Sequence, residues 1–191
     1  MSGKIAFQGE LGAYSHQACV QSRPDFTPVP CATFEEVVEI TQTGGADLAM
    51  LAVENSTYGR VADVHSLLPK AGLHIVDEAF VRVHVNLLGV RGAKLDQITE
   101  AHGHVVILPQ CAGFLRAHNI KGKVSSDNAR AAREVAELND PRRAALASTL
   151  AAQIYGLDVI APEIEDHKNN TTRFLVMSRT ADMSRRSQDM I

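Results

Sequence analysis

Asp-Leu-Ala-Met-Leu-Ala-Val, at residues 47–53, is a nearly continuous apolar stretch of about one strand's length. Strands of this kind are buried on both faces, as in a parallel sheet covered by helices on both sides. Around it, strand-like stretches at 4–7 and 27–31 alternate with helical patterns that begin near Ser15 and at Thr33. Repeated βα units predict an α/β fold with mainly parallel sheets. Ligands of such sheets bind at the carboxyl ends of strands or in a crevice between lobes.

The rest of the chain continues this alternation. The β-branched run 74–90 is longer than a usual strand of about five or six residues, so we expect it to cross from one lobe to another near Glu78. This predicts a first lobe of 1–78 plus 165–179 and a second lobe of 79–164. Further helices are predicted over 34–42, 59–68, 111–118, 127–138 and 148–155, and further strands over 123–125, 144–147, 159–160 and 172–177.

Composition excludes several classes of protein. The 191 residues are 45% apolar and 21% charged, as in ordinary soluble globular proteins. A net charge of −3 argues against a nucleic-acid partner, and no stretch approaches the roughly 20 apolar residues that span a membrane. Met1 to Lys4 leads directly into a strand, so no signal peptide is expected. The three cysteines are Cys19, Cys31 and Cys111, and they lack CxxC spacing. We therefore expect a cytoplasmic chain without a disulfide framework or a zinc site.

Two polar segments stand at the ends of apolar strands. Asn-Asn-Thr-Thr-Arg-Phe at 169–174 runs into the stretch 175–177, and Glu-Asn-Ser-Thr-Tyr-Gly at 54–59 follows the apolar strand 47–53. An arginine at a strand mouth can bind a carboxylate as a planar fork. Each segment alone also fits an ordinary turn or helix cap, so the hypothesis of a binding site depends on both together.

Other candidate motifs are weaker. The loop 9–15 contains glycines but lacks the GxGxxG spacing of dinucleotide sites, although a carboxylate could bind at the helix start near Ser15. His102 and His104 would share one face of a strand, but a metal site there needs a third ligand that the sequence does not single out. No GxSxG motif is present, which disfavours covalent acyl chemistry.

Taken in order, the motifs resemble one family. Those in 9–15, 33–36, 53–61, 110–111 and 169–174 have the order and approximate spacing of the prephenate dehydratase catalytic domain. The resemblance covers residues 4 to about 179. It implies an α/β fold of two lobes like type 2 periplasmic binding proteins, with the site in the cleft between them. It also implies homodimers or larger assemblies, a role in phenylalanine biosynthesis, and no cofactor or metal.

The resemblance also implies roles for particular residues. The reaction would convert prephenate to phenylpyruvate, and Thr172 would hydrogen-bond the leaving hydroxyl beside Glu54, Asn55 and Ser56. Two alternatives stay open: arogenate as the substrate, or a non-catalytic module that binds a small anion. The residues expected to bind substrate are Arg173, Tyr14, Ser15, Thr171, His104, Gln110 and Phe174.

The chain departs from the family pattern at two places. Gly103, Val105 and Val106 replace Ser, Pro and Gln of a second-lobe motif, which we expect to weaken substrate contacts. Ala52 replaces a proline, which loosens the following turn. Family members usually continue into a phenylalanine-binding ACT domain, so we expect either a catalytic fragment or regulation supplied elsewhere. The polar residues 180–191 are expected to be a tail or truncated linker.

Overall fold

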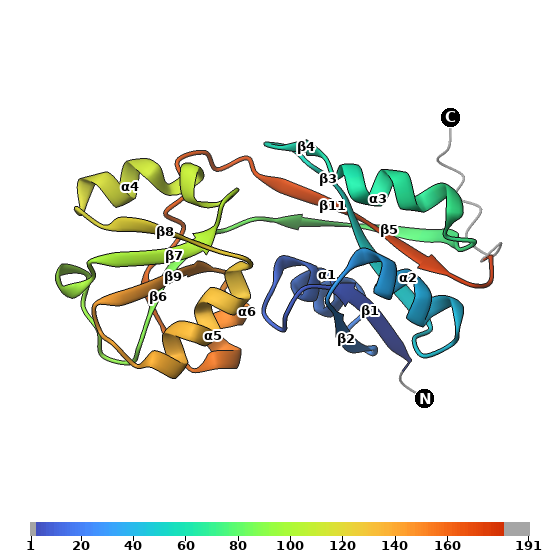
Figure 1. Ribbon diagram of the computed structural model, residues 1–191, viewed down its shortest axis with the longest axis horizontal. Helices are drawn as coiled ribbons and strands as arrows, with labels where there is room; N and C mark the ends of the chain where they lie inside the picture. The colour runs from blue at the N-terminus through green and yellow to red at the C-terminus, as the bar shows by residue number, and fades with distance from the viewer. Residues whose placement is uncertain (1–2, 182–191) are drawn as a thin grey trace.

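The protein folds into two α/β lobes, and the computed structural model describes residues 3–181 (Figure 1). The first lobe contains one sheet with the strand order β2-β1-β3-β11-β5, and β4 pairs with β3 beside it. None of the helices within 3–181 is both long and apolar enough to cross a membrane. The strands of this sheet are β1 (Lys4–Gln8), β2 (Thr27–Cys31), β3 (Leu48–Asn55), β4 (Gly59–Arg60), β5 (His74–Arg82) and β11 (Thr171–Ser178).

Helices cover both faces of the first sheet. On one face α1 (Tyr14–Ser22) packs against a cluster that includes Phe7 and Phe174. On the other lie α2 (Phe34–Gln42), α3 (Ala62–Leu67) and the short η1 (Leu68–Lys70). The start of α2 resembles a capping box, because the Thr33 hydroxyl accepts from the Glu36 N–H at 3.2 Å. Glu36 in turn accepts from a backbone N–H one residue before the cap.

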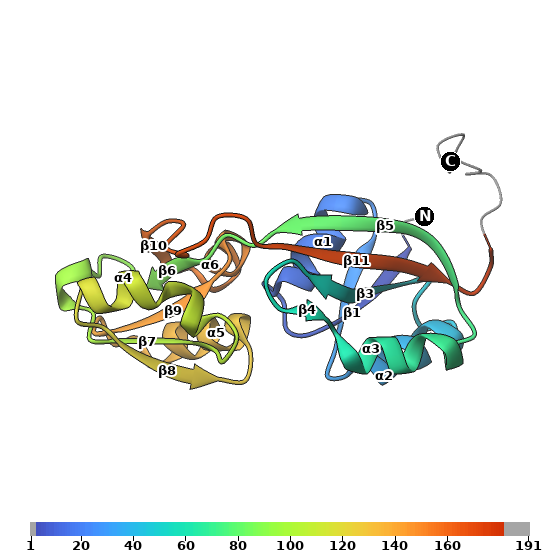
Figure 2. The ribbon, with the colours of Figure 1, turned by 90° about the horizontal axis from the view of Figure 1, so that it is seen from above.

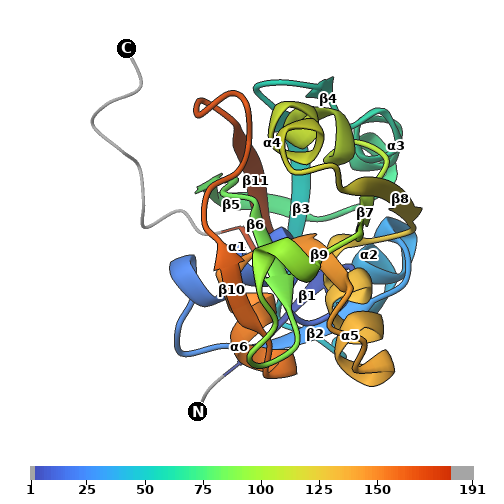
Figure 3. The same ribbon diagram turned by 90° about the vertical axis from the view of Figure 1, so that its left-hand side faces the viewer.

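The second lobe is built on a five-stranded sheet ordered β10-β6-β9-β7-β8. Helices α5 (Asn128–Leu138) and α6 (Thr149–Tyr155) pack on one face, and η3 (Leu108–Cys111) and α4 (Ala112–Ala117) on the other (Figure 3). The short η2 (Leu95–Gln97) precedes β7. The strands are β6 (Asn86–Gly89), β7 (Glu100–His104), β8 (Lys121–Ser125), β9 (Arg143–Ala147) and β10 (Asp158–Ala161).

The chain crosses between the lobes twice, from β5 to β6 and from β10 to β11 (Figure 2). The two crossing segments are hydrogen-bonded to each other, since the Val83 N–H donates to the Asn170 carbonyl at 2.9 Å. Glu165 is almost fully buried there, and its carboxylate accepts from the Val85 N–H at 3.0 Å and contacts His84 at 3.3 Å. A buried carboxylate must be satisfied in this way. The two crossings therefore form one connected hinge.

Two predicted boundaries are wrong. β5 stays paired with β11 as far as Arg82, which faces Thr171, so the crossing lies at 83–85 and not near Glu78. The predicted helix over 59–68 begins only at Ala62, because the first residues form β4 in antiparallel pairing with β3. In both places strand pairing with a partner elsewhere in the chain overrides the local pattern.

The expectation of mainly parallel sheets is also wrong. β1 is parallel to β2 and β3, and β7 is parallel to β8 and β9. The other pairs are antiparallel, including both partners of β11. The reason is the double crossing: β5 leaves the first lobe and β11 returns to it, so they run in opposite directions. Of the predicted tail at 180–191, residues 182–191 lie outside the described part of the chain.

Candidate functional site

Side chains from the two polar segments meet where the lobes join. The Asn55 amide nitrogen donates to Asn170 Oδ1 at 2.6 Å and to Thr172 Oγ1 at 2.9 Å. Asn55 is the last residue of β3, and it faces Thr172 of β11 directly across the sheet. The sheet therefore brings together two segments that are far apart in the sequence.

A β-bulge in β3 makes this meeting possible. In the pairing of β3 with β11, Arg173 faces Glu54 but Phe174 faces Ala52, so β3 carries one extra residue at this point. Side chains alternate between the faces of a strand. Without the extra residue, Thr172 would face Glu54. Bulges re-aim side chains in this way beside functional sites, and here the bulge turns Asn55 to the face of Thr172.

The cluster continues into the second lobe through Gln110. The Asn170 amide donates to Gln110 Oε1 at 2.7 Å, and the Gln110 amide donates to the Val106 carbonyl at 2.9 Å. Asn170 is 2% exposed and Gln110 is 8% exposed. Buried amides need all these partners, so the contacts hold η3 of the second lobe against the first.

The turn after β3 is held by its own polar side chains. Asn55 Oδ1 accepts from the N–H groups of Thr57 and Tyr58 at 2.9 and 3.1 Å, the local bonding typical of an asparagine turn. The Ser56 hydroxyl donates to the Asn169 carbonyl at 2.9 Å and accepts from the Thr171 N–H at 2.9 Å. Ser56 thus joins the turn to the start of β11, and the backbone of Thr171, not its side chain, makes that contact.

Thr172 is placed to act as a hydrogen-bond donor. Its oxygen already accepts from Asn55, so its hydroxyl proton points elsewhere. Among residues 3–181 no acceptor for that proton is within hydrogen-bond distance. A hydroxyl held by one bond and free to donate another can stabilise charge that develops on a departing oxygen.

Arg173 and Glu54 lie on the opposite face of the sheet from Thr172. They face each other across β3 and β11. The Arg173 Nε donates to Glu78 of β5 at 2.6 Å, and both side chains are nearly half exposed. The structure therefore does not bring Glu54 and Arg173 to the polar cluster. Thr172 alone of the Thr-Arg pair joins it.

Three more predicted residues lie outside the hydrogen-bonded cluster, and two of them support the structure around it. Phe174 is 1% exposed within the core under α1, so it supports the site from below and does not line it, contrary to expectation. The Tyr14 hydroxyl donates to the His84 carbonyl at 2.9 Å in the hinge, and burial, followed by the nearby Cys111, raises the pKa of Tyr14 far above its ordinary value. The phenol therefore stays protonated. Ser15, half-buried in the first turn of α1, has no hydrogen-bond partner for its side chain among residues 3–181.

His104 shapes the altered motif of the second lobe. Its N–H donates to Asn128 Oδ1 at 2.8 Å, and its Nδ1 accepts from the Val106 N–H at 3.3 Å. A Cβ on Gly103 would lie 3.1 Å from the Leu146 side chain and 3.4 Å from Asn128 Oδ1. The serine expected here by resemblance would therefore displace its neighbours.

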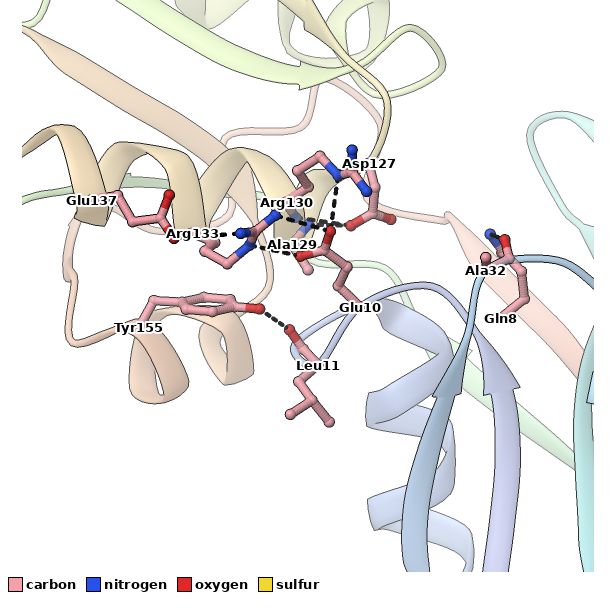
Figure 4. A network of polar contacts seen from close by, with 10 residues as sticks. All are labelled: Gln8, Glu10, Leu11, Ala32, Asp127, Ala129, Arg130, Arg133, Glu137 and Tyr155. Atoms are coloured by element: carbon pink, nitrogen blue, oxygen red, sulfur yellow. Dashed lines mark hydrogen bonds and ion pairs between the residues drawn. The ribbon is translucent and has the colours of Figure 1, made fainter. Parts of the chain in front are cut away.

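The loop after β1 ties the lobes together at another point (Figure 4). Glu10 accepts from Arg130 Nε at 2.8 Å and from Arg133 Nε at 3.0 Å, both on α5. The Tyr155 hydroxyl donates to the Leu11 carbonyl at 2.7 Å (Figure 4). The sequence does not predict these contacts, because no residue of the loop indicates its partners.

A cavity of about 410 Å³ lies beside these contacts, lined by segments 8–10, 30–32 and 126–127 and by Arg130. That volume is in the range of small-molecule sites.

Among residues 3–181, neither His102 nor His104 belongs to a group of three possible metal ligands. Within the described part of the chain, three donor groups that could hold a metal come together at His84, Glu163 and Glu165 in the hinge. That group includes neither His102 nor His104. Glu165 is already satisfied there by a backbone N–H and by His84, so the hinge contacts explain its burial without an ion.

Comparison with known families gives one clear match. A family model described as prephenate dehydratase matches residues 5–182. The chain is 46% identical over 175 residues to a protein of Komagataeibacter europaeus named bifunctional N-acyl-homoserine lactone acylase/prephenate dehydratase, with 92% of this chain and 62% of that protein covered. It is 39% identical to arogenate dehydratase/prephenate dehydratase 1 of Arabidopsis thaliana, covering 92% of this chain and 45% of the relative.

The fold is also that of a solved structure. The crystal structure of prephenate dehydratase in complex with L-Phe from Arthrobacter aurescens superimposes with a TM-score of 0.86 at 29% identity. It covers 94% of this chain and 61% of that one. The chain therefore spans less than two thirds of the length of each of these three proteins.

Proposed function

This chain belongs to the prephenate dehydratase family of hydro-lyases, and we propose that it converts prephenate to phenylpyruvate, water and carbon dioxide. The observation that carries the proposal is the partly buried polar cluster in which Asn55 holds Thr172 and Asn170 at the junction of the lobes. Of the predicted residues, Asn55, Ser56, Thr172 and Gln110 belong to this connected set.

The chemistry asks little of the protein beyond position and hydrogen bonds. When the ring carboxylate leaves as carbon dioxide, its bonding electrons enter the ring and the ring hydroxyl departs, taking one proton from solvent to leave as water, which makes the ring aromatic. The barrier is lowered by holding the substrate in place and by donating to the departing oxygen. Thr172 is a poor acid, so it hydrogen-bonds or relays a proton and does not ionise. Asn55 aims it by occupying the acceptor side of its oxygen.

The substrate carries two carboxylates, which need donors. Arg173 is our candidate for one of them, but it lies on the face of the sheet opposite Thr172 and pairs with Glu78. This role therefore requires Arg173 to release Glu78 and to extend around the end of the sheet toward the substrate. Thr171 shares the face of Arg173, two residues away in β11, and would assist it there. Ser15 of the first lobe and His104 of the second would line the remainder of the site. Glu54 shares the face of Arg173, so its part in the reaction would be to orient that guanidinium.

The test is phenylpyruvate formation from prephenate by the purified chain and its variants. Thr172→Ala should lower kcat by about 100-fold or more, with little change in KM, because the bond to the leaving group tightens in the transition state. Thr172→Ser, which keeps the hydroxyl, should recover much of the activity. Thr43→Ala, at an exposed position after α2, is the control. Normal turnover by Thr172→Ala would contradict the assignment.

Arogenate is the second candidate substrate, since the Arabidopsis relative carries both names. Prephenate and arogenate differ only in a keto or amino group on the side chain. Parallel assays with the two substrates decide between them. If neither is turned over while both bind, the remaining reading is a non-catalytic binding module.

We do not extend the acylase activity in the Komagataeibacter relative's name to this chain. Hydrolysis of an amide through a covalent intermediate needs an activated nucleophile. Burial, with Glu165 and Asp166 nearby, raises the pKa of Cys111 to about 12. Within residues 3–181 no serine, threonine or cysteine side chain is hydrogen-bonded to a histidine. An assay with an acyl-homoserine lactone should therefore show no release of the acyl chain.

We also propose that the chain acts in the cytoplasm as a homodimer. Its three cysteines are free, which supports a reducing compartment. The edge strand β5 exposes Ile75 and Phe80, and an apolar sheet edge is a ready place for a second copy. Sedimentation of the native chain and of Phe80→Glu tests this proposal, because the substitution should shift the population to monomers.

A further inference from the structure

Tyr58 reaches across the boundary between the lobes. It stands in the turn between β3 and β4 of the first lobe. Its hydroxyl donates to the carbonyl oxygen of Val106, at the start of the turn into η3 of the second lobe, at 2.5 Å. Tyr58 is 46% exposed, so its ring adds little to the core. The contact joins two segments that lie 48 residues apart in the sequence.

The carbonyl that Tyr58 contacts is shared. The same Val106 oxygen accepts from the Gln110 amide at 2.9 Å. A carbonyl oxygen has two lone pairs, and here each has one donor. The Val106 carbonyl oxygen therefore helps to position the Gln110 side chain, and the Tyr58 hydroxyl helps to position that oxygen.

These bonds close a circuit around the polar cluster. The Tyr58 N–H donates to Asn55, and the Tyr58 hydroxyl donates to Val106. From Val106 the path runs through Gln110 and Asn170 back to the Asn55 amide. Both ends of Asn55 are therefore fixed, one by the turn that carries Tyr58 and the other by the buried amides. Linked hydrogen bonds polarise one another, and the effect is largest at the buried members of the circuit, Asn170 and Gln110.

We propose that Tyr58 is a positioning residue for the Asn55–Thr172 pair, and that its hydroxyl closes this circuit when the lobes come together. The inference rests on the proposed function, because it assigns Tyr58 to the same site. Among residues 3–181 the Tyr58 hydroxyl is hydrogen-bonded to the Val106 carbonyl alone, and Tyr58 makes no hydrogen bond to Thr172. It acts by holding the turn and η3 in register, so that Gln110, Asn170 and Asn55 keep Thr172 aimed.

The test compares two tyrosines. Tyr58→Phe removes only the hydroxyl. Tyr155→Phe removes a hydroxyl-to-carbonyl bond of the same kind across the same boundary, at Leu11, but outside the circuit. With prephenate, Tyr58→Phe should lower kcat about 3- to 10-fold, the loss of one net hydrogen bond, while KM stays within about twofold. Tyr155→Phe should keep kcat within about twofold of the native chain.

A double substitution shows whether Tyr58 acts through Gln110. In the Gln110→Ala background the circuit is already broken, so adding Tyr58→Phe should change kcat little. Two residues that act independently would instead multiply their effects. The proposal is overturned if Tyr58→Phe leaves kcat unchanged. Multiplicative effects in the double variant, or an equal loss in Tyr155→Phe, would overturn it as well.

Hydrogen exchange separates this proposal from the proposed function. The backbone N–H groups of Ile107 and Gln110 are hydrogen-bonded within the segment 104–111. In Tyr58→Phe the amides of this segment should exchange several-fold faster, and in Tyr155→Phe they should not. This readout needs no turnover. If the native chain has no dehydratase activity but the exchange result holds, the circuit stands and the activity does not. If exchange is unchanged, the positioning role of Tyr58 is wrong.

Discussion

Asn170→Ala should destabilise the protein far more than the same change at its neighbour Asn169. Asn170 is 2% exposed, and its amide joins Asn55 at 2.6 Å and Gln110 at 2.7 Å. The exposed Asn169 contributes its carbonyl, which accepts from Ser56, and its side chain has no hydrogen bond to any residue of 3–181. Both substitutions remove one amide and keep the backbone, so they form a matched pair.

The expected magnitude follows from what each partner loses. Asn55 keeps its bond to Thr172, so losing Asn170 costs it one net hydrogen bond, about 0.5–1.5 kcal/mol. Gln110 Oε1 loses its partner while buried, which costs about 1–3 kcal/mol. The free energy of unfolding should therefore fall by about 2–4 kcal/mol. Asn169→Ala should change it by less than about 0.5 kcal/mol.

Urea unfolding followed by circular dichroism measures both values, with the slope compared to exclude a change in the unfolded state. For a chain of this size the loss in Asn170→Ala corresponds to a fall in Tm of about 5–15 °C. Equal stabilities of the two variants would refute the reasoning. So would a loss below about 0.5 kcal/mol in Asn170→Ala, since the buried amides would then find other partners at no cost.

Three further predictions concern other parts of the fold. Gly12→Ala should lower the free energy of unfolding by about 2–4 kcal/mol, because φ is +96° and the new Cβ would lie 2.9 Å from the backbone of the second lobe. Gly92→Ala, at φ +78° but in open space, should lower it by only about 1 kcal/mol. Urea unfolding of the two variants measures both values. Burial lowers the pKa of His16, whose Nδ1 accepts from the Gly12 N–H, so the unfolded chain binds this proton first and stability should fall as pH drops below 6.5. His16→Gln should flatten that fall in urea midpoints measured from pH 7 to 5, and an unchanged slope would exclude His16 as its source. Glu78→Gln frees Arg173 and should lower KM for prephenate if Arg173 binds a carboxylate; an unchanged KM would argue against that role.

Much of the local structure was accessible from the sequence. Residues 47–53 predict the central strand β3, and the helices predicted over 34–42 and 148–155 are α2 and α6, which Thr33 and Ser148 cap. These features depend on neighbours within a few residues, where side-chain chemistry acts directly on the backbone. The sequence pattern predicts the crossing near Glu78, too early along the chain, because a continuous β-branched run contains no signal of where its pairing partner ends.

The sequence by itself determined the chemistry available at the site. The amides and hydroxyls of 54–59 and 169–174, and their places at the mouths of two strands, can be read from the residue order alone. Only the tertiary structure decided which of them meet. One extra residue in β3 turns Asn55 toward Thr172, while strand alternation turns Arg173 to the other face. The reason is that register is set by pairing between distant segments, and a shift of one residue exchanges the faces of every side chain beyond it.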